Sequence, residues 1–160
     1  MWRPEFVYLT AKPAKLQGYH RSLSVFSHHY RGTPQCPGLV LGLDKGGYCE
    51  GLLYELSAQD WPKAITMVRA REMLGDVYLE KALPVTDLKT NAEYMAITYV
   101  ANRASQQFAP KMPQEKLLAY IAQGQGSMGS CRQYVANTIL HLRQLGIHDE
   151  GLEHLAAHVI

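Results

Sequence analysis

One acidic residue lies on the apolar face of a predicted helix. Trp61, Ala64, Ile65 and Val68 recur at helical spacing and form an apolar stripe. At about 100° per residue, Glu72 falls within about 20° of Trp61, in the middle of that stripe. Burial disfavours the charged form of a carboxyl group and raises its pKa, as a general acid or base working near neutral pH requires. Glu72 is therefore the first candidate for a catalytic residue.

The same position of Glu72 has two structural explanations. Fraying at the end of the helix would turn the side chain outward into solvent. Alternatively, an arginine such as Arg71 or Arg31 could pair with the carboxylate in the interior. The pattern alone leaves these explanations open beside the catalytic one.

The other polar clusters favour simpler roles. His20, His28 and His29 have no close cysteine or acidic partner, and adjacent residues of a strand point to opposite faces. We therefore predict surface histidines and no metal site. The glycine-rich segment 124–129 precedes a predicted helix but lacks the Gly-Lys-Ser/Thr of a phosphate-binding P-loop, so we do not predict a phosphate site.

The three cysteines, Cys36, Cys49 and Cys131, are widely spaced and form no Cys-x-x-Cys pair. None lies in a recognisable nucleophile motif, so we predict small core residues. An odd number of cysteines together with the lack of a signal peptide favours a reducing cytoplasm as the location.

Composition limits the other function classes. The chain has 160 residues, of which 47% are apolar and 19% charged, and its net charge is only +2. These values are typical of one folded domain, which we predict to span residues 1–160. Because lysine and arginine form no dense cluster, neither a nucleic acid nor an anionic membrane is predicted as a partner. No apolar run has the length that a bilayer span requires.

Strands dominate the first half of the chain and helices the second, an order typical of an α+β fold. Asp44–Gly47 has the composition of a hairpin turn, because glycine tolerates positive φ. Ser57 and Ser130 are predicted helix N-caps, with Asp60 and Gln133 three residues further on. We expect strands over residues 16–28, 39–43, 48–56, 77–85 and 93–101, an ordered loop over 30–38, and helices over 57–74, from 113 on, over 130–145 and over 150–158.

Several short motifs occur in one order along nearly the whole chain, and with them the sequence resembles the ChaC-like branch of the γ-glutamylcyclotransferases. The combination of these motifs in this order is more specific than any one of them. The motifs are Met1–Pro4, Arg31-Gly32-Thr33-Pro34, Pro37–Leu43, Cys49-Glu50-Gly51 with Tyr54, Arg71-Glu72-Met73, Tyr99-Val100 with Asn102-Arg103, and Gly129–Tyr134 with Ala136-Asn137.

The resemblance implies a small mixed β-barrel flanked by helices, with a pocket at one end. It implies that the α-amino group of a γ-glutamyl substrate attacks its own γ-amide, which from glutathione gives 5-oxoproline and cysteinylglycine. Glu72 then corresponds to the catalytic acid/base. The reaction uses no metal or organic cofactor, and the implied partner is a small molecule, glutathione or a γ-glutamyl peptide. The substrate-binding residues implied are Arg31, Gly32, Tyr78, Phe108 and Tyr134.

The sequence departs from the family pattern at three places. The first strand, which ends in Tyr-Gly-Ser-Leu in the family, is missing, which would follow from a late start-site assignment, from trimming or from natural truncation. Asp76-Val77-Tyr78 replaces Gly-x-Tyr, and Gln106-Gln107-Phe108 replaces Pro-x-Tyr. A lost tyrosine hydroxyl removes one hydrogen bond, worth about 1 kcal/mol. Two alternatives therefore remain: a catalytically impaired γ-glutamyl-binding protein, and a cyclotransferase for other γ-glutamyl amines or peptides.

Overall fold

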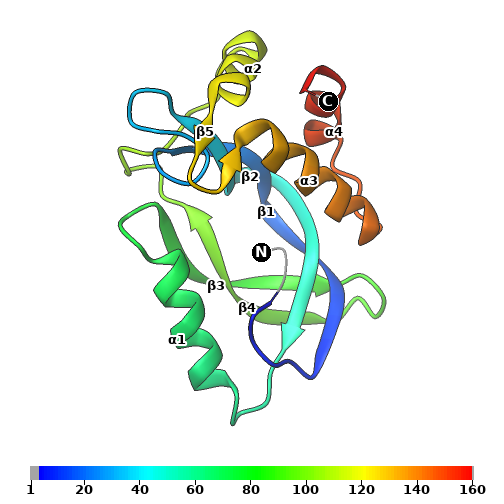
Figure 1. The fold of residues 1–160 in the computed structure, drawn as a ribbon. Coiled ribbons are helices and arrows are strands. Elements are labelled where there is room, and N and C mark those ends of the chain that lie inside the picture. The colour runs from blue at the N-terminus through cyan, green and yellow to red at the C-terminus, as the bar shows by residue number, and fades with distance from the viewer. Residues whose placement is uncertain (1–3, 160) are drawn as a thin grey trace. The chain divides into compact units, whose positions relative to one another are not determined.

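Four long strands form one sheet in the order β2-β1-β3-β4 (Figure 1). The structure is a computed structural model that describes residues 4–159, so residues 1–3 of the first motif lie outside the described residues. Strand β3 pairs antiparallel with both β1 and β4. The strands are β1 (Thr10–Ser27), β2 (Gly38–Glu55), β3 (Tyr78–Asp87) and β4 (Glu93–Ala101).

The chain divides into two compact units. The first unit comprises residues 1–21 and 43–102, and the second comprises residues 22–42 and 103–160. Strands β1 and β2 each contribute one segment to both units. The predicted α+β class is confirmed, since the strands precede most of the helices.

Helix α1 (Trp61–Glu72) packs beside the β3–β4 hairpin in the first unit (Figure 1). It begins later than predicted, because Asp60 and not Ser57 is its N-cap residue. The Ser57 hydroxyl accepts a hydrogen bond from the Asp60 backbone N–H at 3.1 Å and donates one to the Asp60 carboxylate at 2.6 Å, which closes a separate turn before the helix. Ala64 and Val68 are buried as predicted, whereas Trp61 is 44% exposed.

The hairpin predicted at Asp44–Gly47 is wrong, because β2 continues through these residues. Gly46 and Gly47 do have positive φ, at 104° and 64°. Their carbonyls, however, receive side chains of β1: His20 Nδ1 lies 3.0 Å from the Gly46 oxygen, and Gln17 donates to Gly47 at 3.4 Å. The two glycines therefore make a local irregularity of a continuous strand, as in a glycine-containing β-bulge.

Three helices surround the core of the second unit (Figure 1). They are α2 (Gln114–Gln123), α3 (Cys131–Gln144) and α4 (Glu150–Val159), and each pair is in contact. The predicted Ser130 N-cap is confirmed, since its hydroxyl accepts from the Gln133 N–H at 3.1 Å. The apolar residues with the lowest exposure here are Leu39, Ile121, Cys131, Val135 and Ile139.

The glycine-rich segment between α2 and α3 forms a small hairpin of β5 (Gln125–Gly126) and β6 (Gly129–Ser130). It packs backbone to backbone against the loop after β1, because Ser127 N–H donates to His29 O at 2.9 Å and Met128 N–H to Tyr30 O at 3.0 Å. A Cβ added at Gly124 would lie 2.6 Å from Arg31 O and 2.8 Å from Cys131 Cβ. The space between the two segments therefore admits glycine alone.

Cys131 lies at the centre of this contact and is fully buried. Its Sγ accepts from the Leu39 N–H at 3.3 Å and donates to the Leu39 oxygen at 3.1 Å. Burial raises the pKa of the Cys131 thiol. The prediction of a core cysteine is confirmed here and is wrong for Cys36, which is exposed, while Cys49 is half-buried.

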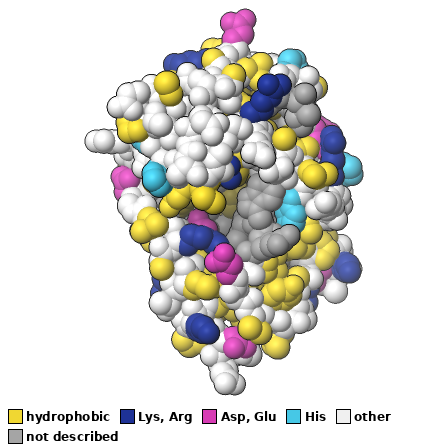
Figure 2. Space-filling view, viewed as in Figure 1, with side chains coloured by type: hydrophobic (Ala, Val, Ile, Leu, Met, Phe, Trp, Pro, Cys, Tyr) yellow, Lys and Arg dark blue, Asp and Glu magenta, His cyan; other side chains and the backbone are white. Residues whose placement is uncertain are grey.

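The surface is mixed in character. On the face shown in Figure 2, lysine, arginine and acidic side chains are scattered among apolar ones without a large region of one sign. Within residues 4–159, no helix is long and apolar enough to cross a membrane.

The glycine contact gives a test of the fold. We expect Gly124→Ala to lower the free energy of unfolding by roughly 1–3 kcal/mol, because the new methyl group must push backbone atoms apart. Gly51→Ala is the matched control, since a Cβ at Gly51 meets nothing within 4 Å and its φ is not positive. Urea unfolding followed by circular dichroism measures both. Equal midpoints for the two variants would contradict the close contact.

Candidate functional site

Glu72 is the last residue of α1, and its side chain is 24% exposed. Its Oε1 accepts from Nε and Nη2 of Arg71, both at 2.9 Å. The expectation of a carboxylate held toward the core is met only in part, because the side chain is half-buried. Arg71 is the arginine partner of Glu72, but the expectation of a buried pair is wrong, because the Arg71 side chain is 39% exposed. The arrangement leaves a partly accessible carboxylate that a small substrate can reach.

One turn before Glu72, α1 is fastened to the sheet through Glu80 of β3. Arg69 donates two hydrogen bonds to this carboxylate, from Nε to Oε2 at 2.7 Å and from Nη2 to Oε1 at 2.6 Å. The Tyr99 hydroxyl of β4 donates to Oε2 at 2.8 Å, and Tyr99 lies directly opposite Glu80 in the strand register. One carboxylate thus joins α1, β3 and β4.

The charges around Glu80 explain its ionisation. The hydrogen bonds from Arg69, opposed by partial burial and helped by Tyr99, lower the pKa of Glu80 from 4.5 to about 2. Burial, followed by the bond to Glu80, raises the pKa of Tyr99, and the negative charge of Glu72 adds to this increase. Glu80 is therefore an anion at neutral pH, and Tyr99 is a neutral phenol.

Tyr78, a predicted substrate-binding residue, begins β3 in the first unit and is half-buried. Asn102 fastens the turn that precedes it: its side chain donates to Asp76 O at 2.7 Å and its backbone N–H donates to Val77 O at 2.9 Å. The position of Tyr78 is thus fixed by the two ends of the β3–β4 hairpin.

The second unit brings three predicted residues together: Arg31, Gly32 and Tyr134. Nη1 of Arg31 donates to the Met128 oxygen, and the guanidinium lies over the Tyr134 ring, 5.2 Å from its centre. The other N–H groups of this guanidinium have no acceptor among the described residues. Such a cation, half-buried and supported by an aromatic ring, is suited to bind a carboxylate.

Gly32 and Tyr134 fix the surroundings of Arg31 through contacts with backbone atoms. A Cβ at Gly32 would lie 2.5 Å from Ser27 O and would also collide with Gly38 N, so the loop can close only around glycine. The Tyr134 hydroxyl accepts from the Leu41 N–H at 3.2 Å, and burial raises the pKa of Tyr134. The Tyr134 side chain is thus neutral and held in place, with the Arg31 guanidinium over its ring.

Phe108, the fifth predicted binding residue, lies elsewhere in the second unit. It pairs with Val25 through an isolated antiparallel bridge, and the Arg103 guanidinium lies 5.8 Å from its ring centre. No described contact joins Phe108 to Arg31.

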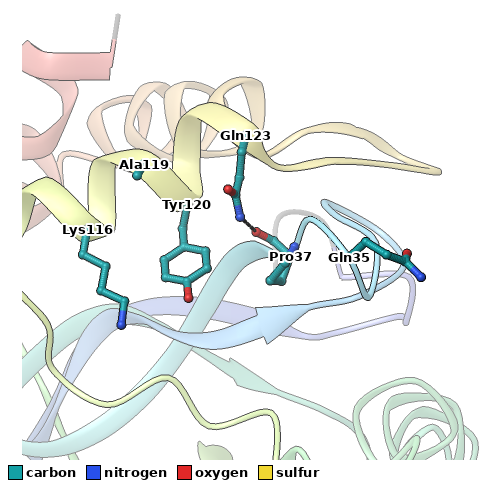
Figure 3. A pocket seen from close by; sticks show the side chains of 6 residues that line it. All are labelled: Gln35, Pro37, Lys116, Ala119, Tyr120 and Gln123. Carbon is teal, nitrogen blue, oxygen red and sulfur yellow. Dashed lines mark hydrogen bonds between the residues drawn. The ribbon is translucent and has the colours of Figure 1, made fainter.

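A shallow groove in the second unit contains none of the predicted residues (Figure 3). Its volume is about 340 Å³, and the Gln123 amide donates across it to Pro37 O at 3.0 Å. The lining residues are Gln35, Pro37, Lys116, Ala119, Tyr120 and Gln123.

Among residues 4–159, no group of three histidine, cysteine or acidic side chains is placed so that it could hold a metal ion. His28 and His29 are exposed and follow β1 instead of lying in it, and His20 is half-buried.

The hydrogen bonds among Arg69, Glu80 and Tyr99 cannot be predicted from the sequence pattern. Tyr99 lies in one of the motifs, but no role is implied for it, and neither Arg69 nor Glu80 stands out by its type or spacing. Only the strand register, which places Glu80 opposite Tyr99, identifies these residues as a network.

Known proteins resemble this chain over nearly its whole length. The family described as ChaC-like protein matches residues 1–160. The glutathione-specific gamma-glutamylcyclotransferase of Escherichia coli (strain K12) is 27% identical over 159 residues, which cover 99% of this chain and 68% of that protein. Gamma-glutamylcyclotransferase 2-3 of Arabidopsis thaliana is 27% identical over 169 residues, covering 99% and 83%.

The fold also matches a solved structure. A crystal structure from yeast, described as a γ-glutamyl cyclotransferase specific to glutathione, is similar with a TM-score of 0.85. The match covers 98% of this chain and 89% of the yeast chain at 18% sequence identity. At that identity the likeness shows the fold.

The Glu80 network predicts a defined loss of stability in acid. Because the pKa of Glu80 is lowered from 4.5 to about 2, its contribution is complete above pH 4.5 and is lost as the pH falls toward 2. We expect wild type to be more stable than Glu80→Gln at neutral pH, and the difference between their urea midpoints to shrink below pH 4.5. Glu93→Gln, at an exposed site in β4, is the control. A difference that stays constant down to pH 2 would contradict the assignment.

Proposed function

The chain belongs to the ChaC-like protein family, and from this premise we propose that it is a γ-glutamylcyclotransferase that cleaves glutathione to 5-oxoproline and cysteinylglycine. The observation that carries the proposal is the partly exposed Glu72 carboxylate at the end of α1, within the Arg-Glu-Met motif. The names of the E. coli and Arabidopsis relatives support the reaction class, and that of the E. coli protein supports the substrate.

The reaction needs little more than orientation and proton transfer. The α-amino nitrogen of the γ-glutamyl group attacks its own γ-carbonyl carbon, so a new C–N bond closes a five-membered ring. The C–N bond to the cysteine nitrogen then breaks, and no water is consumed. Because nucleophile and electrophile belong to one molecule, an enzyme gains most by holding them in the reactive geometry.

Glu72 supplies the proton transfer in this proposal. Its carboxylate takes a proton from the α-amino group and gives it to the departing amide nitrogen, which leaves as the amine of cysteinylglycine. The ion pair with Arg71 at 2.9 Å restricts the carboxylate to a narrow range of positions. No step requires a metal or an organic cofactor.

Arg31 is the proposed binding residue for a substrate carboxylate. Its guanidinium is supported by Tyr134 and Met128, and it keeps N–H groups without a described acceptor. Gly32 shapes the same loop. We propose that Tyr78 and Phe108 also contact substrate; these roles rest on the family motif and not on a described contact.

The leaving group is the part of the substrate that the departure at Phe108 concerns, because Phe108 replaces a tyrosine of the family. A cyclotransferase acting on other γ-glutamyl amines would use the same carboxylate and differ only in the leaving group. A panel of γ-glutamyl compounds, assayed for 5-oxoproline as the common product, distinguishes glutathione from other γ-glutamyl amines as the substrate. A binding protein without turnover is the remaining candidate, and retained affinity without product would identify it.

We also propose that residues 1–160 act as one domain in a reducing cytoplasm. The full-length family match supports the single domain. Three cysteines without a disulfide support the reducing compartment.

Glu72→Gln tests the assigned base. The amide keeps the shape of the side chain but does not accept the proton, so we expect kcat with glutathione to fall by about 10²–10⁴-fold. The measurement is release of 5-oxoproline and cysteinylglycine, with circular dichroism to show an intact fold. Glu93→Gln is the matched control and should retain the wild-type rate. Full activity in Glu72→Gln would remove Glu72 from the mechanism.

Arg31→Lys tests carboxylate binding. Lysine keeps the charge but loses the planar fork of donors, so we expect KM for glutathione to rise about tenfold, equivalent to roughly 1.4 kcal/mol, with a smaller change in kcat. Arg143→Lys, an exposed arginine of α3 paired with Glu153, is the control. An unchanged KM in Arg31→Lys would show that this guanidinium does not hold the substrate.

A further inference from the structure

The last turn of α1 has little apolar anchorage although it carries the proposed base. The buried residues of this helix are Ala64 and Val68, both before that turn. Met73 and Leu74, which follow Glu72, are 41% and 63% exposed. Terminal turns of helices fray when packing does not hold them. The contact that holds this turn to the sheet is therefore polar: the two hydrogen bonds from Arg69 to Glu80.

Arg71 already bonds Oε1 of Glu72. Arg69 and Tyr99 are the groups that would weaken Glu72 further as a base if they bonded it as well. Arg69 precedes Glu72 by three residues, a spacing at which helical side chains of opposite charge pair. The negative charge of Glu72 adds to the raised pKa of Tyr99, after burial and the hydrogen bond to Glu80. A guanidinium or a hydroxyl that bonds a carboxylate stabilises its anion and makes it a poorer proton acceptor.

Both groups are instead committed to Glu80. Arg69 gives Nε and Nη2 to the two oxygens of that carboxylate, at 2.7 and 2.6 Å. An ionised carboxylate accepts hydrogen bonds and donates none, so the single hydroxyl proton of Tyr99 must point at Glu80 in the 2.8 Å contact. Toward Glu72, Tyr99 can then offer only the lone pairs of its oxygen.

We propose that Glu80 is a positioning residue for Glu72: it anchors the last turn of α1 and holds the Arg69 and Tyr99 donors away from the Glu72 carboxylate. The inference rests on the proposed function of Glu72 as the base. Four charged or titratable groups of the described residues bear on Glu72. They are Arg71 of α1, which bonds it, Arg69 of α1 and Tyr99 of β4, and Glu80 of β3, which accepts from both Arg69 and Tyr99.

Glu80→Gln releases both donors and is the primary test. With glutathione as substrate, we expect kcat to fall about tenfold, KM to stay within about twofold, and the acid limb of the kcat/KM profile to move down by about one pH unit. In Glu80→Gln/Arg69→Met/Tyr99→Phe, where the released donors are gone, we expect the acid limb to return to its wild-type position. Glu80→Asp, which keeps the negative charge, should also leave the acid limb near its wild-type position.

A merely structural role of Glu80 makes a different prediction. It would lower the Tm of Glu80→Gln while leaving the acid limb of that variant unmoved, and that result would overturn the proposal. An acid limb that remains displaced after both donors are removed would overturn it as well. If Glu80→Gln does not fold, Glu80→Met, which releases the same two donors without placing an amide among them, takes its place in this test and in the next.

A second measurement is independent of turnover. The side-chain carboxyl ¹³C signal of Glu72, assigned by its loss in Glu72→Gln, can be titrated in wild type and in Glu80→Gln or Glu80→Asp. We expect its midpoint to be lower in Glu80→Gln than in wild type, and equal midpoints would overturn the positioning role. If wild type releases no 5-oxoproline but these midpoints differ, the proposed function fails and the positioning role stands.

Discussion

The carboxylate of Glu80 is the interaction on which the arrangement of the first unit depends. Helix α1 buries Ala64 and Val68 but reaches Glu72 with its last turn largely uncovered. The Glu80 carboxylate binds this turn to the sheet by a bidentate bond to Arg69 and a third bond from Tyr99. A charged group on a strand thus does what an apolar side chain does in most helices: it defines where the helix end lies.

In the second unit, close packing of backbone atoms, and not a charged side chain, holds the segment that carries a proposed site residue. Its loop after β1 and its β5–β6 hairpin approach each other through backbone atoms, with Gly32 and Gly124 where a Cβ would collide. Arg31 extends from this close contact and rests on Tyr134. A guanidinium on a loop is ordinarily mobile, whereas here the loop itself has no room to shift. The end of α1 in the first unit is therefore held by a charged carboxylate, whereas the loop that carries Arg31 in the second unit is held by backbone contacts that only glycine permits.

The sequence predicted those features that depend on local pattern. The β3 and β4 strands and the Ser130 cap follow from residues near each other in the chain, whereas the catalytic role of Glu72 stays a prediction. Two features were missed because they depend on partners far away. Gly46 and Gly47 have the composition of a turn, but the side chains of β1 keep them within a strand. Glu80 becomes significant only once the strand register places it opposite Tyr99.

The place of Cys131 has a consequence for an enzyme whose proposed substrate and product both carry thiols. Thiol–disulfide exchange requires a thiolate that another sulfur can approach in line. Cys131 is fully buried, its thiol bonds Leu39 in both directions, and burial keeps it protonated. A mixed disulfide with glutathione therefore has no route to the core at this residue. Of the three cysteines Cys36 is the exposed one, so an oxidised thiol in solution reaches the protein's sulfur there and not in the core.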